Sequence, residues 1–190
     1  MKDSNVFSEI SCTKECDRDI KEIINGSVVM MSPTSPKHNR LVRRLANLLE
    51  EALPSMCEVY TESVALDIPI SLKKSPKDYV QPDVMVLCNT EWNGSKAKTI
   101  PTLVIEVLSE SKESEIIRDT KVKRKLYEAM GVKEYLIVSQ DGFIITCRLN
   151  RSNTYEVFYN TLGLSEGVVF KSEYLSGFEV DIDKLYNMWL

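Results

Sequence analysis

The chain has 190 residues, a formal net charge of −4 and a sequence pI of about 5.2. This acidic balance counts against a protein whose whole surface coats nucleic acid, although a protein that binds nucleic acid locally needs only one basic face. No apolar run approaches the roughly 18 residues of a membrane span, and the mixed charges of the first residues argue against a secretory signal.

The first half of the chain predicts strands around one long helix. The opening stretch, to about Asn25, has mixed charge and weak periodicity, so we expect a short helix or a loosely held arm with little chemistry. Apolar residues at helical spacing predict a helix over residues 36–53, which Pro54 ends. The stretches with β-forming composition are 28–31, 58–72 and 79–87. Pro82 should mark the beginning of a strand or a bulge.

The second half predicts a buried strand, a helix and a set of hairpins. The run LVIEVLS from Leu103 is typical of a fully buried central strand. A helix is expected over 111–130, ended by Gly131, with a buried face formed by Ile116, Ile117, Thr120, Lys123, Leu126 and Tyr127. A hairpin should turn at Asp141 and Gly142, and short strands at 155–159 and 168–170 should precede a closing helix over 182–190.

This element order predicts an α/β (α+β) fold with a mixed sheet flanked by helices. The length suits one core, so we expect an N-terminal arm or short helix over 1–19 and a single domain over 20–190. Five cysteines, an odd and scattered set, favour reduced thiols in a cytoplasmic protein over a disulfide framework or a zinc site. They are Cys12, Cys16, Cys57, Cys88 and Cys147.

Two acids interrupt apolar strands, Asp83 in VQPDVMVL and Glu106 in TLVIEVLS. A buried carboxylate costs several kcal/mol unless it is paired or bound to a cation. The separation of 106 − 83 = 23 residues is enough for two adjacent antiparallel strands, so both side chains could converge. Oxygen ligands that converge in this way suit Mg²⁺. Asp83→Ala should then abolish the chemistry and leave folding intact or improved.

Along the following helix Asp119, Lys123 and Tyr127 share one stripe at a spacing of four residues. An ordinary helix pair and a core tyrosine would explain Asp119 and Tyr127 equally well. Lys123 could reach the carboxylates if its helix packs beside the Glu106 strand, where its ammonium would orient an attacking water. From spacing alone, the functional and the structural readings of Lys123 stay open.

Several motifs occur in one order: GSVVMMSPTSPKHN, VQPDVMVL, PTLVIEVLSES, the Asp119 and Lys123 helix, and GVKEYLIV. Together they closely resemble the Uma-two family of restriction-endonuclease-like proteins, which is similar to the PD-(D/E)XK nuclease superfamily. The resemblance covers roughly residues 20–190. It implies a mixed sheet flanked by helices and motif acids that bind the catalytic metal.

Carried over residue by residue, the resemblance makes Asp83 and Glu106 the motif acids, and Lys123 the catalytic lysine. A direct E-x-K motif would put lysine at position 108, where this chain has Leu108, so the lysine is mapped to the next helix. The expected Mg²⁺ ligands are Asp83, Glu106 and the carbonyl of Val107, with Mn²⁺ as the other candidate cation.

The accessory candidates are weaker. His38 follows the SPTSP segment, where the family often carries histidine and where it would approach the metal or a phosphate; a lone histidine there is more often just a polar residue. Glu62 in YTESVAL is ordinarily a solvated acid on a strand, and Asp119 and Tyr127 complete the accessory set.

The resemblance implies a metal-dependent endonuclease that hydrolyses phosphodiester bonds of DNA. The alternative is a nuclease-like fold kept as an interaction module for nucleic acid or protein, without turnover. The acidic pI favours the module, whereas two acids buried together favour the enzyme. The partner is nucleic acid in the first case, with DNA preferred to RNA and no membrane involved, and the oligomeric state stays open, a homodimer included.

Overall fold

The computed structural model describes residues 21–30, 34–108, 113–161, 169–181 and 185–186. The expected arm over 1–19 and most of the expected closing helix over 182–190 lie outside these ranges. Among the described helices, none is long and apolar enough to cross a membrane.

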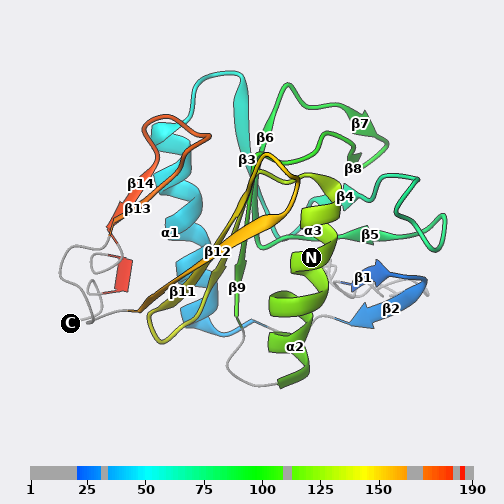
Figure 1. The fold of residues 1–190 in the computed structure, drawn as a ribbon, viewed down its shortest axis with the longest axis horizontal. Coiled ribbons are helices and arrows are strands. Elements are labelled where there is room, and N and C mark those ends of the chain that lie inside the picture. Colours follow the sequence, from blue (N-terminus) through cyan, green and yellow to red (C-terminus); the bar gives the residue numbers. More distant parts are fainter. Residues whose placement is uncertain (1–20, 31–33, 109–112, 162–168, 182–184, 187–190) are drawn as a thin grey trace, which may run out of the picture.

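The main sheet has six strands in the order β12-β11-β10-β9-β6-β3 (Figure 1). Only β9 and β10 run parallel; the other neighbours are antiparallel, so the sheet is mixed as predicted. All five residues of β9 are buried, which fits its apolar sequence. The strands are β3 (Cys57–Thr61), β6 (Val84–Cys88), β9 (Leu103–Val107), β10 (Glu134–Val138), β11 (Phe143–Leu149) and β12 (Tyr155–Thr161).

Helices cover both faces of this sheet, and each face has its own hydrophobic core (Figure 1). Helix α1 (Pro36–Ala52) packs through Leu41, Leu45 and Leu49 against one face. On the other face, Tyr127 and Met130 of α3 (Arg124–Met130) pack with alternate residues of the same strands. The predicted α+β class, a mixed sheet between helices, is confirmed.

A second sheet has the strand order β2-β1-β5-β4-β8-β7 and lies beside α3 (Figure 1). Its strands are β1 (Lys21–Ile24), β2 (Ser27–Met30), β4 (Ala65–Asp67), β5 (Tyr79–Val80), β7 (Trp92–Asn93) and β8 (Lys96–Ala97). A small third sheet pairs β13 (Val169–Lys171) with β14 (Glu179–Asp181). The expectation of a helix or loose arm up to Asn25 is wrong for residues 21–24. They form β1, which pairs with both β2 and β5.

The predicted single strand over 79–87 is two strands in two sheets. β5 belongs to the second sheet and β6 to the main sheet, with Gln81, Pro82 and Asp83 between them. Proline lacks the N–H that a sheet ladder requires, so it stands at the crossing between sheets. Asp83 therefore lies directly before a buried strand, where its carboxylate can contact other segments of the chain.

The predicted helix over 111–130 contains a π-helical turn. It runs as α2 (Glu113–Ile117), the π turn η1 (Arg118–Lys123) and α3. Ile116 and Ile117 were expected on the buried face but are 38% and 41% exposed, whereas Asp119 and Lys123 are buried. In an α-helix, positions four apart drift by about 40° per step, and a wider π turn opposes that drift. The π turn thus keeps the polar stripe against the sheet.

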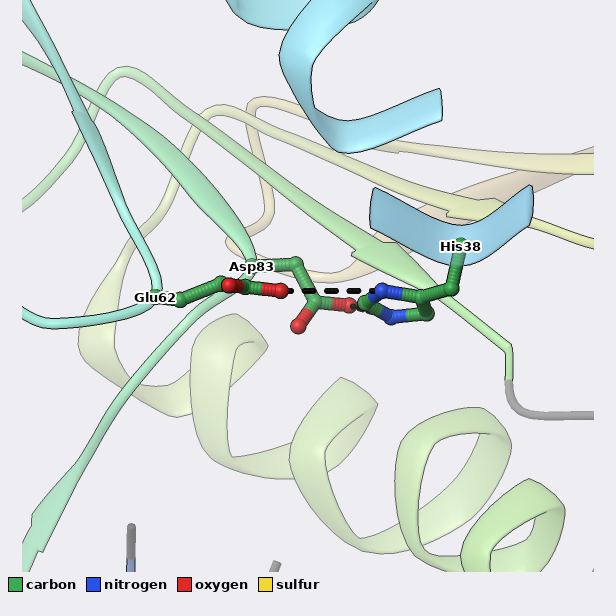
Figure 2. Close-up of side chains that lie close together, drawn as sticks. All are labelled: His38, Glu62 and Asp83. Carbon is green, nitrogen blue, oxygen red and sulfur yellow. Dashed lines mark hydrogen bonds and ion pairs between the residues drawn. The ribbon is translucent and has the colours of Figure 1, made fainter. Parts of the chain in front are cut away.

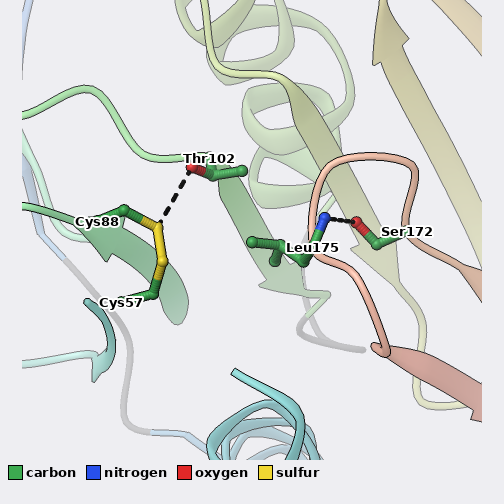
Figure 3. Close-up of a disulfide and its surroundings, with 5 residues drawn as sticks. All are labelled: Cys57, Cys88, Thr102, Ser172 and Leu175. Atoms are coloured by element: carbon green, nitrogen blue, oxygen red, sulfur yellow. Dashed lines mark hydrogen bonds between the residues drawn. A yellow bond between two sulfur atoms is a disulfide. The ribbon is translucent and has the colours of Figure 1, made fainter. Parts of the chain in front are cut away.

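The structure overturns the expectation that all the cysteines are reduced. Cys57 of β3 and Cys88 of β6 face each other across the strand pair and form a disulfide (Figure 3). The Oγ1 of Thr102 lies 3.8 Å from the Sγ of Cys88. Cysteines 31 positions apart in sequence became neighbours only through strand register. Cys147 is free and buried, and burial raises the pKa of its thiol to about 11.

Candidate active site

Asp83 and Glu106 meet at the end of the β6 and β9 pair. Val84 pairs with Ile105 in this antiparallel ladder, so the next positions outward, Asp83 and Glu106, lie opposite each other. Asp83 is 5% exposed and Glu106 2% exposed. The sequence-based expectation that two antiparallel strands bring these acids together matches the register.

Asp83 is held by two contacts through the same oxygen. Its Oδ2 accepts the backbone N–H of Val107 at 2.6 Å and lies 3.2 Å from the Nε2 of His38. Val107 was expected to offer its carbonyl to a metal. That role of the carbonyl stays a prediction, and the N–H of Val107 has a separate contact, which orients the carboxylate of Asp83.

The start of α1 positions His38. Ser35 caps the helix by accepting the His38 N–H at 3.1 Å, and Pro36 occupies the first turn, where a missing N–H costs nothing. The Ser35 hydroxyl also donates to Gln140 Oε1 at 2.9 Å, and Gln140 in turn donates to the carbonyl of Leu108. This chain of hydrogen bonds fixes the beginning of α1 to the end of β9, so His38 faces Asp83.

His38, Glu62 and Asp83 point toward one another from three different segments (Figure 2). Their candidate ligand atoms all lie within 4.8 Å of one another. The Nδ1 of His38 and the Oε1 of Glu62 are buried, 3.6 Å apart and without a hydrogen-bond partner among the described residues. Buried polar atoms are rarely left without a hydrogen-bond partner, because each such atom costs about 1–3 kcal/mol. These two unsatisfied atoms have lone pairs that could bind a cation, and together with the carboxylate of Asp83 they fit a divalent cation.

The pKa values of His38 and Glu62 are both raised in this cluster. Burial would lower the pKa of His38, but its contact with Asp83 and the charges of Asp83 and Glu62 outweigh burial and raise it above 6.5. Burial raises the pKa of Glu62, and the negative charge of Asp83 adds to this rise. The cluster therefore attracts positive charge, which either protons or a metal ion can supply.

Glu106 has partners of its own on the helical side. Its Oε1 accepts hydrogen bonds from the Nζ of Lys123 at 2.9 Å and from the hydroxyl of Tyr127 at 2.9 Å. Burial raises the pKa of Glu106 well above its usual range; the Lys123 charge opposes this effect and that of Asp83 adds to it. The helix thus supplies one cation and one hydroxyl to a single carboxylate oxygen.

Lys123 lies at the centre of three carboxylates. Its ammonium is fully buried and contacts Glu22 at 2.8 Å, Glu106 at 2.9 Å and Asp119 at 3.8 Å. Burial acts to lower the pKa of Lys123, but these carboxylates outweigh burial and raise it. Asp119 is also held by Arg118, whose Nε donates to Asp119 Oδ1 at 3.1 Å. Lys123 therefore stays an ammonium, and Lys121 and Lys125 are exposed on the same helix.

The structure brings all of the expected site residues into two adjoining groups. Asp83, His38 and Glu62 form the first, and Glu106, Lys123, Tyr127 and Asp119 form the second; Val107 joins them through its backbone. Sequence reasoning missed Glu22, because residues up to Asn25 were not expected to carry chemistry. The available signal was an acid between Lys21 and two isoleucines, directly before the Asn25 and Gly26 turn.

The family model described as "Putative restriction endonuclease", Uma2, matches residues 12–182. The chain belongs to the Uma2 family. This match spans most of the sequence and both groups of site residues. It confirms the resemblance drawn from the motifs.

Two further proteins are similar to this Uma2 chain. An uncharacterised protein of Synechocystis, sll1609, is 32% identical over 124 residues, which span 63% of this chain and 66% of that protein. A crystal structure from Anabaena variabilis, described as "a putative nuclease belonging to DUF820", superimposes with a TM-score of 0.67. That match has 11% identity and covers 90% of this chain and 91% of the other, so it shows a shared fold.

Proposed function

We propose that the chain is a metal-dependent endonuclease that hydrolyses phosphodiester bonds of DNA in the cytoplasm. The observation that carries the proposal is the convergence of His38, Glu62 and Asp83 within 4.8 Å, beside a second group centred on Glu106 and Lys123. A structural core has little need for this arrangement, since acids buried together repel and are costly. Membership of the Uma2 family supports a nuclease.

The proposed cation is Mg²⁺ or Mn²⁺, held by Asp83, His38 and Glu62, with Glu106 beside it. The imidazole of His38 favours Mn²⁺, because nitrogen ligands suit that ion better than they suit Mg²⁺. When bound, the cation would activate a water and stabilise negative charge on the phosphate. The contact with the Val107 N–H fixes the Asp83 carboxylate in the orientation needed for this task.

The side chains on the helix have electrostatic roles in the proposal. Lys123 is held as an ammonium, so it cannot accept a proton from water; it offers fixed positive charge to the phosphate or the attacking hydroxide. Lys123 and Tyr127 both bind Oε1 of Glu106. This leaves Oε2 of Glu106 to receive the proton of the water, and the raised pKa of this carboxyl suits a base.

The test is cleavage of duplex, single-stranded and branched DNA, and of RNA, by wild type and Asp83→Asn with Mg²⁺ and with Mn²⁺. We expect cation-dependent cleavage of DNA that Asp83→Asn abolishes. Glu134→Gln is the matched control: Glu134 is a fully buried acid of β10, and its partners are Arg148, Ser172 and the backbone N–H of Glu173. Wild type that binds cation and cuts nothing in this panel would favour the interaction module.

A further inference from the structure

Glu22 joins three parts of the molecule that are far apart in sequence. It lies on β1, in the second sheet, and is fully buried. Its Oε1 lies 2.8 Å from the Nζ of Lys123 and accepts the backbone N–H of Gln81 at 2.9 Å. Gln81 stands two residues before Asp83, so one carboxylate oxygen contacts both the helix and the segment that delivers the first motif acid.

We infer that Glu22 is a positioning residue that fixes the Lys123 ammonium against Glu106, an inference that rests on the proposed nuclease function. A lysine side chain has many rotamers, and Glu106 at 2.9 Å with the more distant Asp119 at 3.8 Å would leave its ammonium free to pivot. Glu22 and Glu106 hold Nζ at 2.8 Å and 2.9 Å from two different sheets. The second sheet thereby becomes part of the catalytic apparatus.

The energetics favour a functional role for Glu22 over a purely structural one. A buried ion pair is often no more stable than apolar side chains of the same volume. The Oε2 of Glu22 is also buried without a hydrogen-bond partner among the described residues, which adds a further cost. Costs of this kind are characteristic of functional sites, where charge placement matters more than stability.

The hairpin that carries Glu22 is anchored separately, and this anchor provides a control. Asp78, which is 1% exposed, accepts the N–H groups of Gly26, Lys74 and Ser75 at 2.8, 2.8 and 3.0 Å. It fixes the turn between β1 and β2 without any described contact to Lys123. Asp78→Asn therefore disturbs the same hairpin while it leaves the charge of Glu22 in place.

The experiment is a double-mutant cycle of Glu22→Gln and Lys123→Met, measured by steady-state DNA cleavage. Glu22→Gln should lower kcat by at least about tenfold with little change in KM, as expected when positioning for the transition state is lost. Because Glu22 acts through Lys123, the double variant should be no slower than Lys123→Met alone. Asp78→Asn should keep kcat within about threefold of wild type, since it touches no reacting group.

A second readout does not need activity. The four proteins of the cycle are wild type, the two single variants and the double variant. Their chemical unfolding without cation should show a coupling between Glu22 and Lys123 of at least about tenfold in the unfolding equilibrium constant. Independent losses in kcat, or the absence of this coupling, would overturn the inference. If wild type cuts nothing, the proposed function fails, and the unfolding cycle still decides whether Glu22 holds Lys123.

If Glu22→Gln does not fold, Glu22→Asp takes its place. Its shorter side chain keeps the charge but withdraws it from Nζ, so this variant should fold and have a low kcat. A wild-type kcat for Glu22→Asp would contradict the inference.

Discussion

Substitution of Asp83 separates the catalytic role of its charge from the structural role of its oxygen. Asp83, which is 5% exposed, accepts the N–H of Val107 at 2.6 Å. Asp83→Ala leaves that N–H without an acceptor, which costs about 1–3 kcal/mol. At a pH high enough to keep His38 neutral, Asp83→Asn keeps an acceptor oxygen and removes the negative charge that faces Glu62 and Glu106, so its folding should match or exceed that of the metal-free wild type.

The expectation from sequence that Asp83→Ala leaves folding intact or improved should therefore fail, whereas Asp83→Asn should keep the stability of the fold. For a domain of this size 1 kcal/mol shifts the Tm by roughly 2–4 °C, so the alanine variant should melt roughly 2–12 °C below the asparagine variant. Thermal melts in a chelator measure the gap, and both variants should lose cation-dependent cleavage. Equal Tm values for the two would refute the assigned role of the Val107 hydrogen bond.

Two further predictions concern redox state and pH. Reduction of the Cys57 and Cys88 disulfide should lower the free energy of unfolding by about 3–4 kcal/mol, the loop-closure value for a separation of 31 residues; urea titrations with and without a dithiol measure it, and a double serine variant that still responds to the dithiol would contradict it. Without cation, stability should fall as the pH rises from about 5 to 8, because the pKa values of Glu62, Glu106 and His38 are raised in the folded state, which then binds more protons than the unfolded chain. Mn²⁺ competes with those protons, so its stabilising effect in thermal melts should grow with pH; a metal-free protein that becomes more stable toward pH 8 would oppose this reasoning.

The main sheet was predictable because its strands carry strong local signals. The apolar run around Glu106 indicated a central buried strand, and Pro82 indicated a strand beginning, so the meeting of Asp83 and Glu106 followed from two strand assignments. β1 was missed because four residues with mixed charge give no periodicity. One of its partners, β2, is local across the Asn25 and Gly26 turn, but the other, Tyr79, is distant in sequence.

Other parts of the site depend on geometry that periodicity does not contain. The π turn at Arg118–Lys123 decides which side of the helix is buried. The α-helical pattern predicted that Ile116 and Ile117 would be buried, whereas Asp119 is buried in the structure. Glu62 belongs to the site because the backbone N–H of Glu62 bonds the Asp83 carbonyl, a contact set by the register of β3 and β6. The residue types could be read from the sequence in each case, but the π turn and the strand register determine which residues become neighbours.

The most direct test of the metal site uses the fact that the chain has a single histidine. Electron spin-echo spectroscopy of bound Mn²⁺, on protein free of purification histidines, detects a coordinated imidazole nitrogen. We predict a nitrogen modulation that changes when histidine is labelled with ¹⁵N and that disappears in His38→Gln. Mn²⁺ that binds wild type without any nitrogen modulation would contradict the site formed by His38, Glu62 and Asp83.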